Sequence, residues 1–165
     1  MRMAQVGLEL HPGKTRIVYC KDSNRIGSDE HEQFTFLGYT FRPRRSKGRR
    51  GWFVGFLPAV SNDAAKGART EIKRWRLHLR SDLSLKDLAD WVNPVVRGWV
   101  AYYGRFYRSA LYPTLQRIND YLRRWARRKY KRLRTSRRRT WAWLEQVARR
   151  APTLFAHWHL GGALP

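Results

Sequence analysis

Residues 52–79 read WFVGFLPAVSNDAAKGARTEIKRWRLHL, and the spacing of the apolar residues changes within this stretch. Before Ser61 they form a short run that Pro58 closes, as in a β-strand. After Ser61 they recur every three or four positions, as on one face of a helix: Ala65, Ala68, Ile72, Trp75 and Leu79. Ser61 or Asn62 can cap this helix, and Asp63 suits its first turn. The sequence therefore predicts a β-rich part that is followed by a helical part.

The β-rich part contains three runs of strand length, at residues 16–20, 34–41 and 52–57. In the second run, aromatic residues alternate with polar ones on either side of Gly38, which is typical of a strand pair. Two hairpin-like connections follow, so we predict a small antiparallel sheet. Residues 42–51 are expected to form a loop between its strands.

Three signals divide the helical part further. Ser84, with an aspartate three residues later, resembles a capping box at a helix start. Asn93 and Pro94 are expected to interrupt that helix and to open a new one, and another helix begins near Pro113. That helix should bury Leu115, Ile118, Leu122 and Trp125. With a short last helix at residues 141–148, the fold class is α+β: a β piece at 1–60, a helical bundle at 61–150 and a C-terminal tail at 151–165.

The chain of 165 residues is strongly basic, with 35 Lys and Arg against 12 Asp and Glu, a net charge of +23. Residues 1–33 are neutral in sum, so the whole excess lies in residues 34–165. It is concentrated in residues 42–50, with six basic residues, and 123–139, with eleven; neither block contains an acid. Such charge repels itself unless a polyanion neutralises it, so we expect nucleic acid rather than a membrane surface. Aromatic residues within or just after the second block favour the same reading: Trp125, Tyr130, Trp141 and Trp143.

Other classes of protein are disfavoured by what the sequence lacks. A single cysteine, Cys20, excludes an internal disulfide framework and a Cys-rich zinc module. Residues 13–15, Gly-Lys-Thr, lack the first glycine of a phosphate-binding loop, and His157 with His159 reads as a packed or surface pair. We therefore expect no catalytic residue and no metal site. There is no long apolar segment and no signal-peptide core, so we expect a cytoplasmic protein.

Four segments carry a more specific signal when they are taken together. They are GLELHPGKTRIVYCKD at 7–22, FTFLGYTFRP at 34–43, NPVVRGWVAYYGRF at 93–106 and LFAHW at 154–158. LGY alone is a weak motif, but LGY followed by RGWxxYY at helical spacing is specific. In the same order and over nearly the whole chain, these segments resemble the C-terminal half of group II intron-encoded reverse transcriptases, also called maturases.

The resemblance implies a role for each part of the chain. Residues 1–60 would be the last part of the palm, with Lys14 near the polymerase site and a primer-grip hairpin formed by Phe36, Leu37, Gly38 and Tyr39. Residues 61–150 would be the thumb, or maturase domain, which in the family grips intron RNA and helps it fold. The implied partner is structured group II intron RNA or an RNA/DNA duplex.

The family's fingers and most of its palm have no counterpart here, including the Tyr-Ala-Asp-Asp segment whose aspartates hold magnesium. We therefore expect no catalysis from this chain alone, and Mg²⁺ only if a complementary reverse transcriptase fragment supplied the missing palm. The chain resembles a truncated remnant or a gene fragment. Three hypotheses stay open: an RNA-binding maturase fragment, one half of a split reverse transcriptase, and an inactive relic or general basic packing protein.

Basic side chains are the candidate RNA contacts in both parts of the chain. The β-rich part contributes Arg42, Arg44, Arg45, Lys47, Arg49 and Arg50. The helical part contributes Arg97, Arg124, Arg127, Arg128 and Lys131, of which the last four are expected to share one helix face and to follow a ridge of phosphates. A stripe of apolar and aromatic residues is expected to be core rather than an RNA platform: Val95, Trp99, Tyr102, Tyr103 and Phe106.

Overall fold

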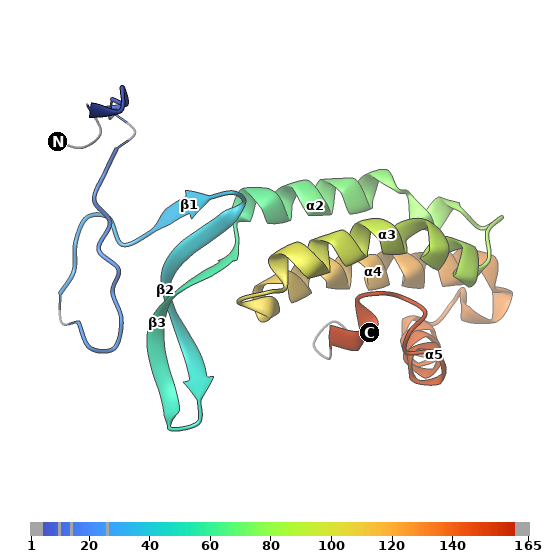
Figure 1. Cartoon of the computed structure of the whole chain (residues 1–165). Helices are drawn as coiled ribbons and strands as arrows, with labels where there is room; N and C mark the ends of the chain where they lie inside the picture. Colours follow the sequence, from blue (N-terminus) through green and yellow to red (C-terminus); the bar gives the residue numbers. More distant parts are fainter. Residues whose placement is uncertain (1–4, 10, 14, 26, 161–165) are drawn as a thin grey trace. The chain divides into compact units, whose positions relative to one another are not determined.

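The computed structural model describes residues 5–9, 11–13, 15–25 and 27–160, and Figure 1 shows its elements. Lys14 lies outside the described residues. A three-stranded antiparallel sheet precedes the helices, which confirms the α+β class. The chain forms two compact units, one of Met1–Phe34 with Phe41–Leu57 and one of Thr35–Thr40 with Pro58–Pro165. In the described part of the chain, no helix is long and apolar enough to cross a membrane.

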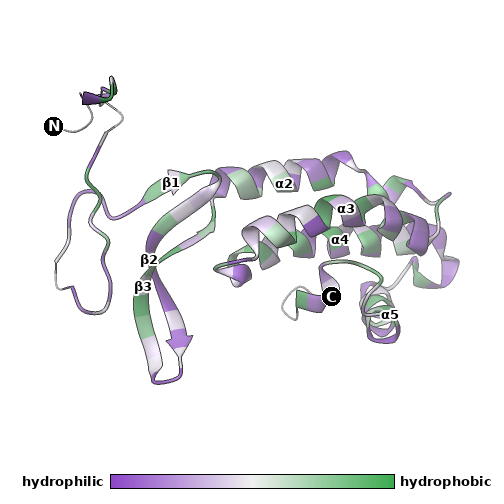
Figure 2. Ribbon diagram, in the orientation of Figure 1, coloured by the Kyte–Doolittle hydropathy of each residue, from purple (hydrophilic) through white to green (hydrophobic). Residues whose placement is uncertain are grey.

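The sheet contains β1 (Phe34–Phe36), β2 (Tyr39–Gly48) and β3 (Gly51–Val60), in that order. The turn between β1 and β2 consists of two residues, Leu37 and Gly38, whose φ angles of 47° and 78° are both positive. This is the backbone that a two-residue hairpin turn requires. Figure 2 shows that β2 is largely hydrophilic whereas β3 is largely hydrophobic.

Three expectations for the β-rich part are wrong. Pro58 does not close the third run, because β3 continues through it to Val60. Residues 16–20 are not a strand, because the described segment finds no neighbouring strand; the Tyr19 amide donates instead to the His31 carbonyl at 2.8 Å. Residues 42–51 are not a loop, because β2 continues to Gly48 and β3 begins at Gly51. Strand pairing uses only backbone groups, so a long hairpin can keep its cationic side chains in solvent.

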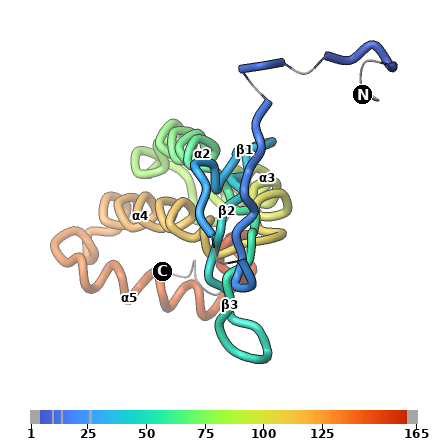
Figure 3. Tube along the Cα trace, turned by 90° about the vertical axis from the view of Figure 1, so that its left-hand side faces the viewer, coloured from blue at the N-terminus to red at the C-terminus, as the bar shows by residue number. Residues whose placement is uncertain are grey.

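The helices of the second unit are α2 (Asn62–Arg74), α3 (Leu85–Tyr103), α4 (Tyr112–Lys129) and α5 (Arg137–Arg150). Short 3₁₀ turns follow them: η1 (Leu77–Leu79), η2 (Arg108–Leu111), η3 (Lys131–Leu133) and η4 (Trp158–Leu160). In Figure 1, α2 and α3 are seen from the side and α5 end-on, whereas Figure 3 shows α5 from the side. The direction of α5 therefore crosses that of α2 and α3.

Three of the predicted helix starts are confirmed, those at Ser61, at Ser84 and near Pro113. The last helix, predicted at 141–148, instead spans Arg137–Arg150. The Ser61 hydroxyl accepts a hydrogen bond from the Ala64 amide at 3.1 Å. Ser84 and Asp87 form a reciprocal capping box, with distances of 3.2 and 2.9 Å. Proline stands in the first turn of α4, as expected. Each such cap contributes on the order of 1 kcal/mol to helix stability.

The core of the second unit forms around α4, which contacts α2, α5 and the turns η1, η2 and η3. The four residues predicted to point inward from α4 are fully buried: Leu115, Ile118, Leu122 and Trp125. They belong to one cluster with Ile72, Leu88, Val92 and Val96. Burying each such side chain contributes about 1.5–3 kcal/mol, which explains why the apolar spacing fixes these helices.

Two expectations for the helices are wrong. Leu79 is 43% exposed, because α2 ends at Arg74 and Arg76 takes a left-handed conformation with φ 50°. The chain therefore turns into η1, and Leu77 enters the core instead. Pro94 does not end a helix but lies inside α3. Buried residues on both sides of it keep α3 continuous, and their packing offsets the hydrogen bond that proline cannot make.

Residues 151–160, which we predicted to form a C-terminal tail, pack into this core. Phe155 is fully buried. The Asn93 side chain donates to the Leu154 carbonyl at 2.9 Å and accepts from the Ala156 amide at 2.8 Å. Asn93 was expected to cap a new helix, but its amide group instead attaches the C-terminal segment to α3.

A second asparagine attaches the same segment to α4. The Asn119 carbonyl oxygen accepts from His157 Nε2 at 2.8 Å and from Trp158 Nε1 at 3.0 Å. His157 is fully buried, and this burial lowers its pKa to about 3. The neutral ring therefore carries its hydrogen on Nε2, and His157 is a packed core residue, which was one of the two expectations for it.

Candidate nucleic-acid interface

Basic residues occupy the surface of α4 that the core leaves free. Arg124 and Arg128 are exposed, and Arg127 is half-buried. They lie in the last turns of the helix, where positive charge interacts favourably with the helix dipole. The same helix thus supplies core residues on one side and cations on the other.

A groove of about 760 Å³ follows the C-terminal end of α4, and we call it the basic groove. It is lined by His78, Arg124, Arg127, Arg128, Lys129, Lys131 and Arg134. None of these lining residues is acidic. The groove brings together the four cations predicted on one helix face, although that prediction was wrong in one respect: Lys131 lies in η3, beyond the end of α4.

Contacts to the protein hold several of these cations in place. Arg127 donates from Nε and Nη2 to the Arg134 carbonyl, at 3.3 and 3.1 Å. Lys129 Nζ donates to the Leu83 carbonyl at 2.5 Å. The Arg124 guanidinium lies 5.3 Å from the centre of the Tyr121 ring. The groove is therefore partly preorganised, which lowers the entropic cost of binding an anion.

His78 reaches the groove from η1, and no feature of the sequence identified it. Burial lowers its pKa, and the positive charges of Arg128, Arg124 and Arg76 lower it further. The imidazole is therefore neutral at pH 7. Sequence reasoning also left Lys129 and Arg134 out of the candidate contacts, although both lie in the second basic block.

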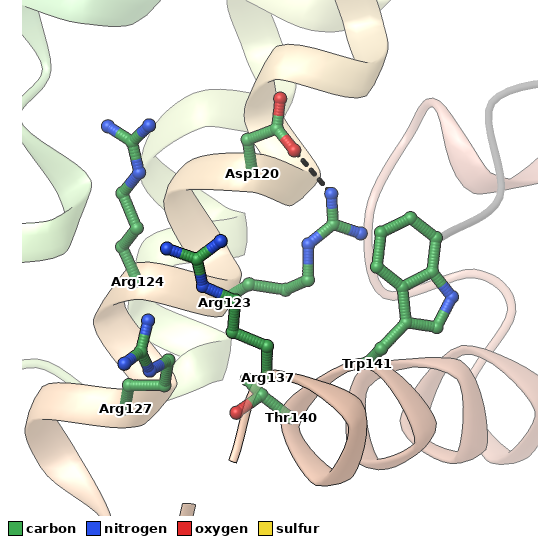
Figure 4. Close-up of a pocket in the computed structure, with 7 residues that line it drawn as sticks. All are labelled: Asp120, Arg123, Arg124, Arg127, Arg137, Thr140 and Trp141. Atoms are coloured by element: carbon green, nitrogen blue, oxygen red, sulfur yellow. Dashed lines mark hydrogen bonds and ion pairs between the residues drawn. The ribbon is translucent and has the colours of Figure 1, made fainter. Parts of the chain in front are cut away.

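A second pocket lies between α4 and α5, and we call it the α4–α5 pocket (Figure 4). It is lined by Asp120, Arg123, Arg124, Arg127, Arg137, Thr140 and Trp141. Arg123 forms an ion pair with Asp120, and its guanidinium lies 3.8 Å from the centre of the Trp141 ring. Two of the arginines, Arg124 and Arg127, line both this pocket and the basic groove.

Three of the four aromatic residues that favoured nucleic-acid binding are structural instead. Trp125 is fully buried, and its Nε1 donates to the Arg80 carbonyl at 2.8 Å. Tyr130 and Trp143 pack against it with ring centres 5.8 and 6.5 Å away. The helical period places Trp125 on the same face as Leu122, so its burial follows from the spacing. Trp141, by contrast, is 48% exposed.

The aromatic stripe of α3 divides between core and surface. Trp99 stacks on Trp75 at 5.6 Å, and both Trp99 and Tyr103 pack against the core, as expected. Val95, Tyr102 and Phe106 are exposed, so for them the expectation is wrong. The Tyr102 hydroxyl donates to the Leu37 carbonyl at 2.9 Å, which attaches the β1–β2 turn to α3.

The residues with a predicted primer-grip role form this turn and the strand positions on either side of it. Phe36 and Leu37 are exposed, whereas Tyr39 is buried and its hydroxyl donates to the Tyr102 carbonyl. A Cβ on Gly38 would lie 2.9 Å from the Tyr103 hydroxyl oxygen. The turn is thus fixed to the end of α3 by contacts that the sequence did not reveal.

The remaining basic candidates lie elsewhere. Residues 42–50 belong to the first unit, on β2 and the turn after it. Arg44 is half-buried there and donates from Nε to the Leu57 carbonyl at 3.2 Å, while the Arg45 guanidinium lies 5.5 Å from the Trp52 ring centre. The other four are exposed: Arg42, Lys47, Arg49 and Arg50. Arg97 is exposed on α3 and does not line the basic groove.

Metal-binding residues do not gather at either site. Among residues 5–9, 11–13, 15–25 and 27–160, no group of three or more His, Cys, Asp or Glu residues could hold a metal ion. Both sites are instead surfaces of positive charge, and what they can do chemically is bind anions.

Comparison with known proteins assigns a family to the helical unit. No curated protein and no solved structure matches the chain. The family model described as the group II intron, maturase-specific domain matches residues 65–158, which is more than half of the chain. The match runs from α2 to η4 and includes the residues that line the basic groove and the α4–α5 pocket. The chain therefore belongs to the family of group II intron maturase-specific domains.

Proposed function

We propose that this chain is an RNA-binding maturase, which binds structured group II intron RNA through the basic groove and assists its splicing. One observation carries the proposal. Six cations and a neutral histidine line one groove without a carboxylate, and this groove lies inside the region that matches the maturase-specific family.

The chemistry of the groove supports RNA as the ligand. Four of its six cations are arginines, whose planar fork suits bidentate contact with phosphate oxygens. Repulsion among these charges destabilises the free protein, and a run of phosphates removes this repulsion. An RNA helix presents such a run of phosphates beside a shallow minor groove that is recognised largely by shape.

The proposal extends to the rest of the chain. Residues 1–60 are assigned to the end of a reverse transcriptase palm, with Phe36, Leu37, Gly38 and Tyr39 as a primer-grip hairpin. Residues 61–150 are assigned to the thumb, and residues 151–160, which were expected to be a tail, extend it because they pack into its core. The four sequence segments that resemble group II intron reverse transcriptases support this assignment.

A salt titration tests the role of the groove. The variant R124A/R127A/R128A/K131A should bind every RNA more weakly than the wild type. It should also flatten the slope of log affinity against log salt by roughly 2–4 units, if each cation contacts about one phosphate. Affinity is measured by filter binding from low to moderate salt, with intron RNA and with an unrelated duplex of equal length.

The matched control removes four exposed cations that do not line the groove: K66A/R69A/K73A/R138A. Because it removes the same formal charge, it should weaken binding slightly through long-range attraction and leave the slope nearly unchanged. A quadruple groove variant that is folded by circular dichroism and keeps the wild-type slope would contradict the proposal. A wild type without preference for intron RNA would favour a general packing protein instead.

A further inference from the structure

The α4–α5 pocket concentrates positive charge more than its single acid can neutralise. Four arginines line it against one carboxylate, Asp120, and Arg123 already pairs with that carboxylate. Figure 4 shows Arg137 extending from the first turn of α5 toward α4, so that its guanidinium lies among those of the α4 arginines. Two helices therefore bring like charges to one place, and such an arrangement is stable chiefly when an anion occupies it.

Arg123 has hydrogen-bonding capacity that the described residues do not use. Its Nη1 is buried and makes no hydrogen bond within the described part of the chain. Buried polar groups usually have a partner, so a small shift of the Arg123 side chain would let this nitrogen donate to an acceptor atom of a ligand in the pocket. A phosphate group fits, because it offers several acceptor oxygens and a negative charge to a cluster of guanidinium groups.

Trp141 forms the side of the pocket beside Arg123. The Arg123 guanidinium covers the ring at 3.8 Å, and yet 48% of Trp141 is exposed. An exposed tryptophan ring next to a phosphate site offers a stacking surface for a nucleobase. Bases inside a duplex are stacked on each other, so only an unpaired nucleotide can place its base on Trp141 while its phosphate lies in the pocket.

We propose that the α4–α5 pocket binds a single unpaired nucleotide of RNA, with its phosphate among Arg123, Arg124 and Arg137 and its base stacked on Trp141. The inference rests on the proposed function and adds to it what kind of RNA feature the protein selects. Arg124 and Arg127 line both sites, so one strand can run from the basic groove into the pocket. The groove then supplies affinity, and the pocket supplies preference for a bulge or an internal loop.

The test uses the full chain and three RNA hairpins of otherwise identical sequence. One hairpin is fully paired, one carries a single-nucleotide bulge, and one carries the same bulge without its base. The wild type should prefer the bulged hairpin over both others by about 5- to 150-fold, which is the effect of one base stacked on an aromatic ring. W141A should lose this preference and keep its affinity for the paired hairpin. Fluorescence anisotropy gives the three affinities.

Neighbouring arginines of α5 provide the matched control. Arg137 lines the pocket, whereas Arg138 is exposed and does not line it. R137A should weaken binding of the bulged hairpin more than of the paired one, and R138A should weaken both equally. The inference is wrong if a folded W141A keeps the wild-type preference. It is also wrong if the wild type does not discriminate between the bulged hairpin and the hairpin whose bulge is abasic. The second outcome does not depend on the folding of any variant.

The same measurements distinguish a failure of this inference from a failure of the proposed function. Arg128 and Lys131 line the basic groove but not the pocket. If R128A/K131A weakens binding of all three hairpins alike while the wild type does not discriminate among them, the groove is an RNA site and the pocket is not. If R128A/K131A changes the affinity for none of them, the proposed function itself is contradicted.

Discussion

At the scale of single residues, the buried contact between Asn119 and His157 links the stability of the helical unit to pH. The unfolded histidine has a pKa near 6.5, whereas burial lowers the pKa of folded His157 to about 3. Below pH 6.5 this histidine is therefore protonated in the unfolded chain, whereas it stays neutral in the folded chain. The contribution of His157 to the free energy of unfolding is fully present above pH 6.5 and is lost as the pH decreases from 6.5 toward 3.

We predict a loss of up to about 1.4 kcal/mol per pH unit from His157 in this window. Urea unfolding at pH 7, 6, 5 and 4 measures it. His78 acts in the same direction, since its pKa is lowered as well. The comparison is therefore with H157Q, whose amide can still donate to Asn119 but does not titrate. If the wild type and H157Q lose stability at the same rate between pH 6 and 4, His157 is not the titrating group.

Residues with local partners were predictable, and those with distant partners were not. Ser61 and Ser84 bond to amides three residues away, so their sequence neighbourhood identified them as caps. Asn93 contacts Leu154, 61 residues later, and Asn119 contacts His157, 38 residues later. A buried asparagine does not belong to a periodic apolar pattern. It is buried because a segment distant in the sequence packs against it, so the sequence around it does not indicate its role.

At the scale of elements, the turn between β1 and β2 depends on a glycine. Gly38 has φ 78°, and a Cβ there would lie 2.9 Å from the Tyr103 hydroxyl oxygen. We therefore predict that G38A lowers the free energy of unfolding by about 1–3 kcal/mol. Chemical denaturation followed by circular dichroism measures the change.

Gly67 provides the control for this prediction. It lies inside α2, and nothing within 4 Å would touch an added Cβ. G67A should therefore stabilise the protein by up to about 1 kcal/mol, because alanine favours a helix over glycine. Opposite signs for the two substitutions are expected, and a stabilising G38A would show that the turn tolerates an ordinary side chain.

The boundaries of an element could be predicted from the sequence where buried residues recur with a clear period. The prediction was wrong where strand pairing or tertiary packing determines the boundary. The apolar spacing of α2 and α4 located both helices, because one face of each is core. Residues 42–51 were predicted to be a loop because their many charged side chains are unusual for a strand. They nevertheless pair with β3, which is the next segment of the chain. Pro94 looked like a boundary because sequence alone does not weigh a missing hydrogen bond against the packing of α3.

At the scale of the whole molecule, the cations of the candidate site were partly predictable. The second basic block identified Arg124, Arg127, Arg128 and Lys131, which the fold then placed in one groove. It did not separate them from Arg137, which α5 carries into a different pocket. Nor did it distinguish Trp141 from the buried tryptophans, since exposure depends on how α5 packs against α4.

A net charge of +23 should also make stability sensitive to the kind of anion in solution. Sulfate binds among clustered arginines better than chloride does, and a ligand of the folded state raises Tm by mass action. We predict that sulfate raises Tm by about 3–5 °C more than sodium chloride of equal ionic strength, the equivalent of roughly 1.4 kcal/mol at ten times its dissociation constant. Differential scanning calorimetry gives both values.

Sulfate also stabilises proteins in general, because it is excluded from their surfaces. The variant R124A/R127A separates the two effects, since both residues line the groove and the pocket. It should keep the general effect and lose most of the additional increase. If sulfate raises the Tm of this variant as much as that of the wild type, the sulfate ions bind to other cations of the protein.

The attachment of the C-terminal segment to α3 and α4 has a consequence during synthesis on the ribosome. Asn93 and Asn119 obtain their partners only when residues 154–158 have been made. Until then, the nascent helices expose the apolar surface that Phe155 and Trp158 later cover. Translation that stops shortly before residue 154 would release a polypeptide whose helices leave this apolar surface exposed to chaperones and proteases.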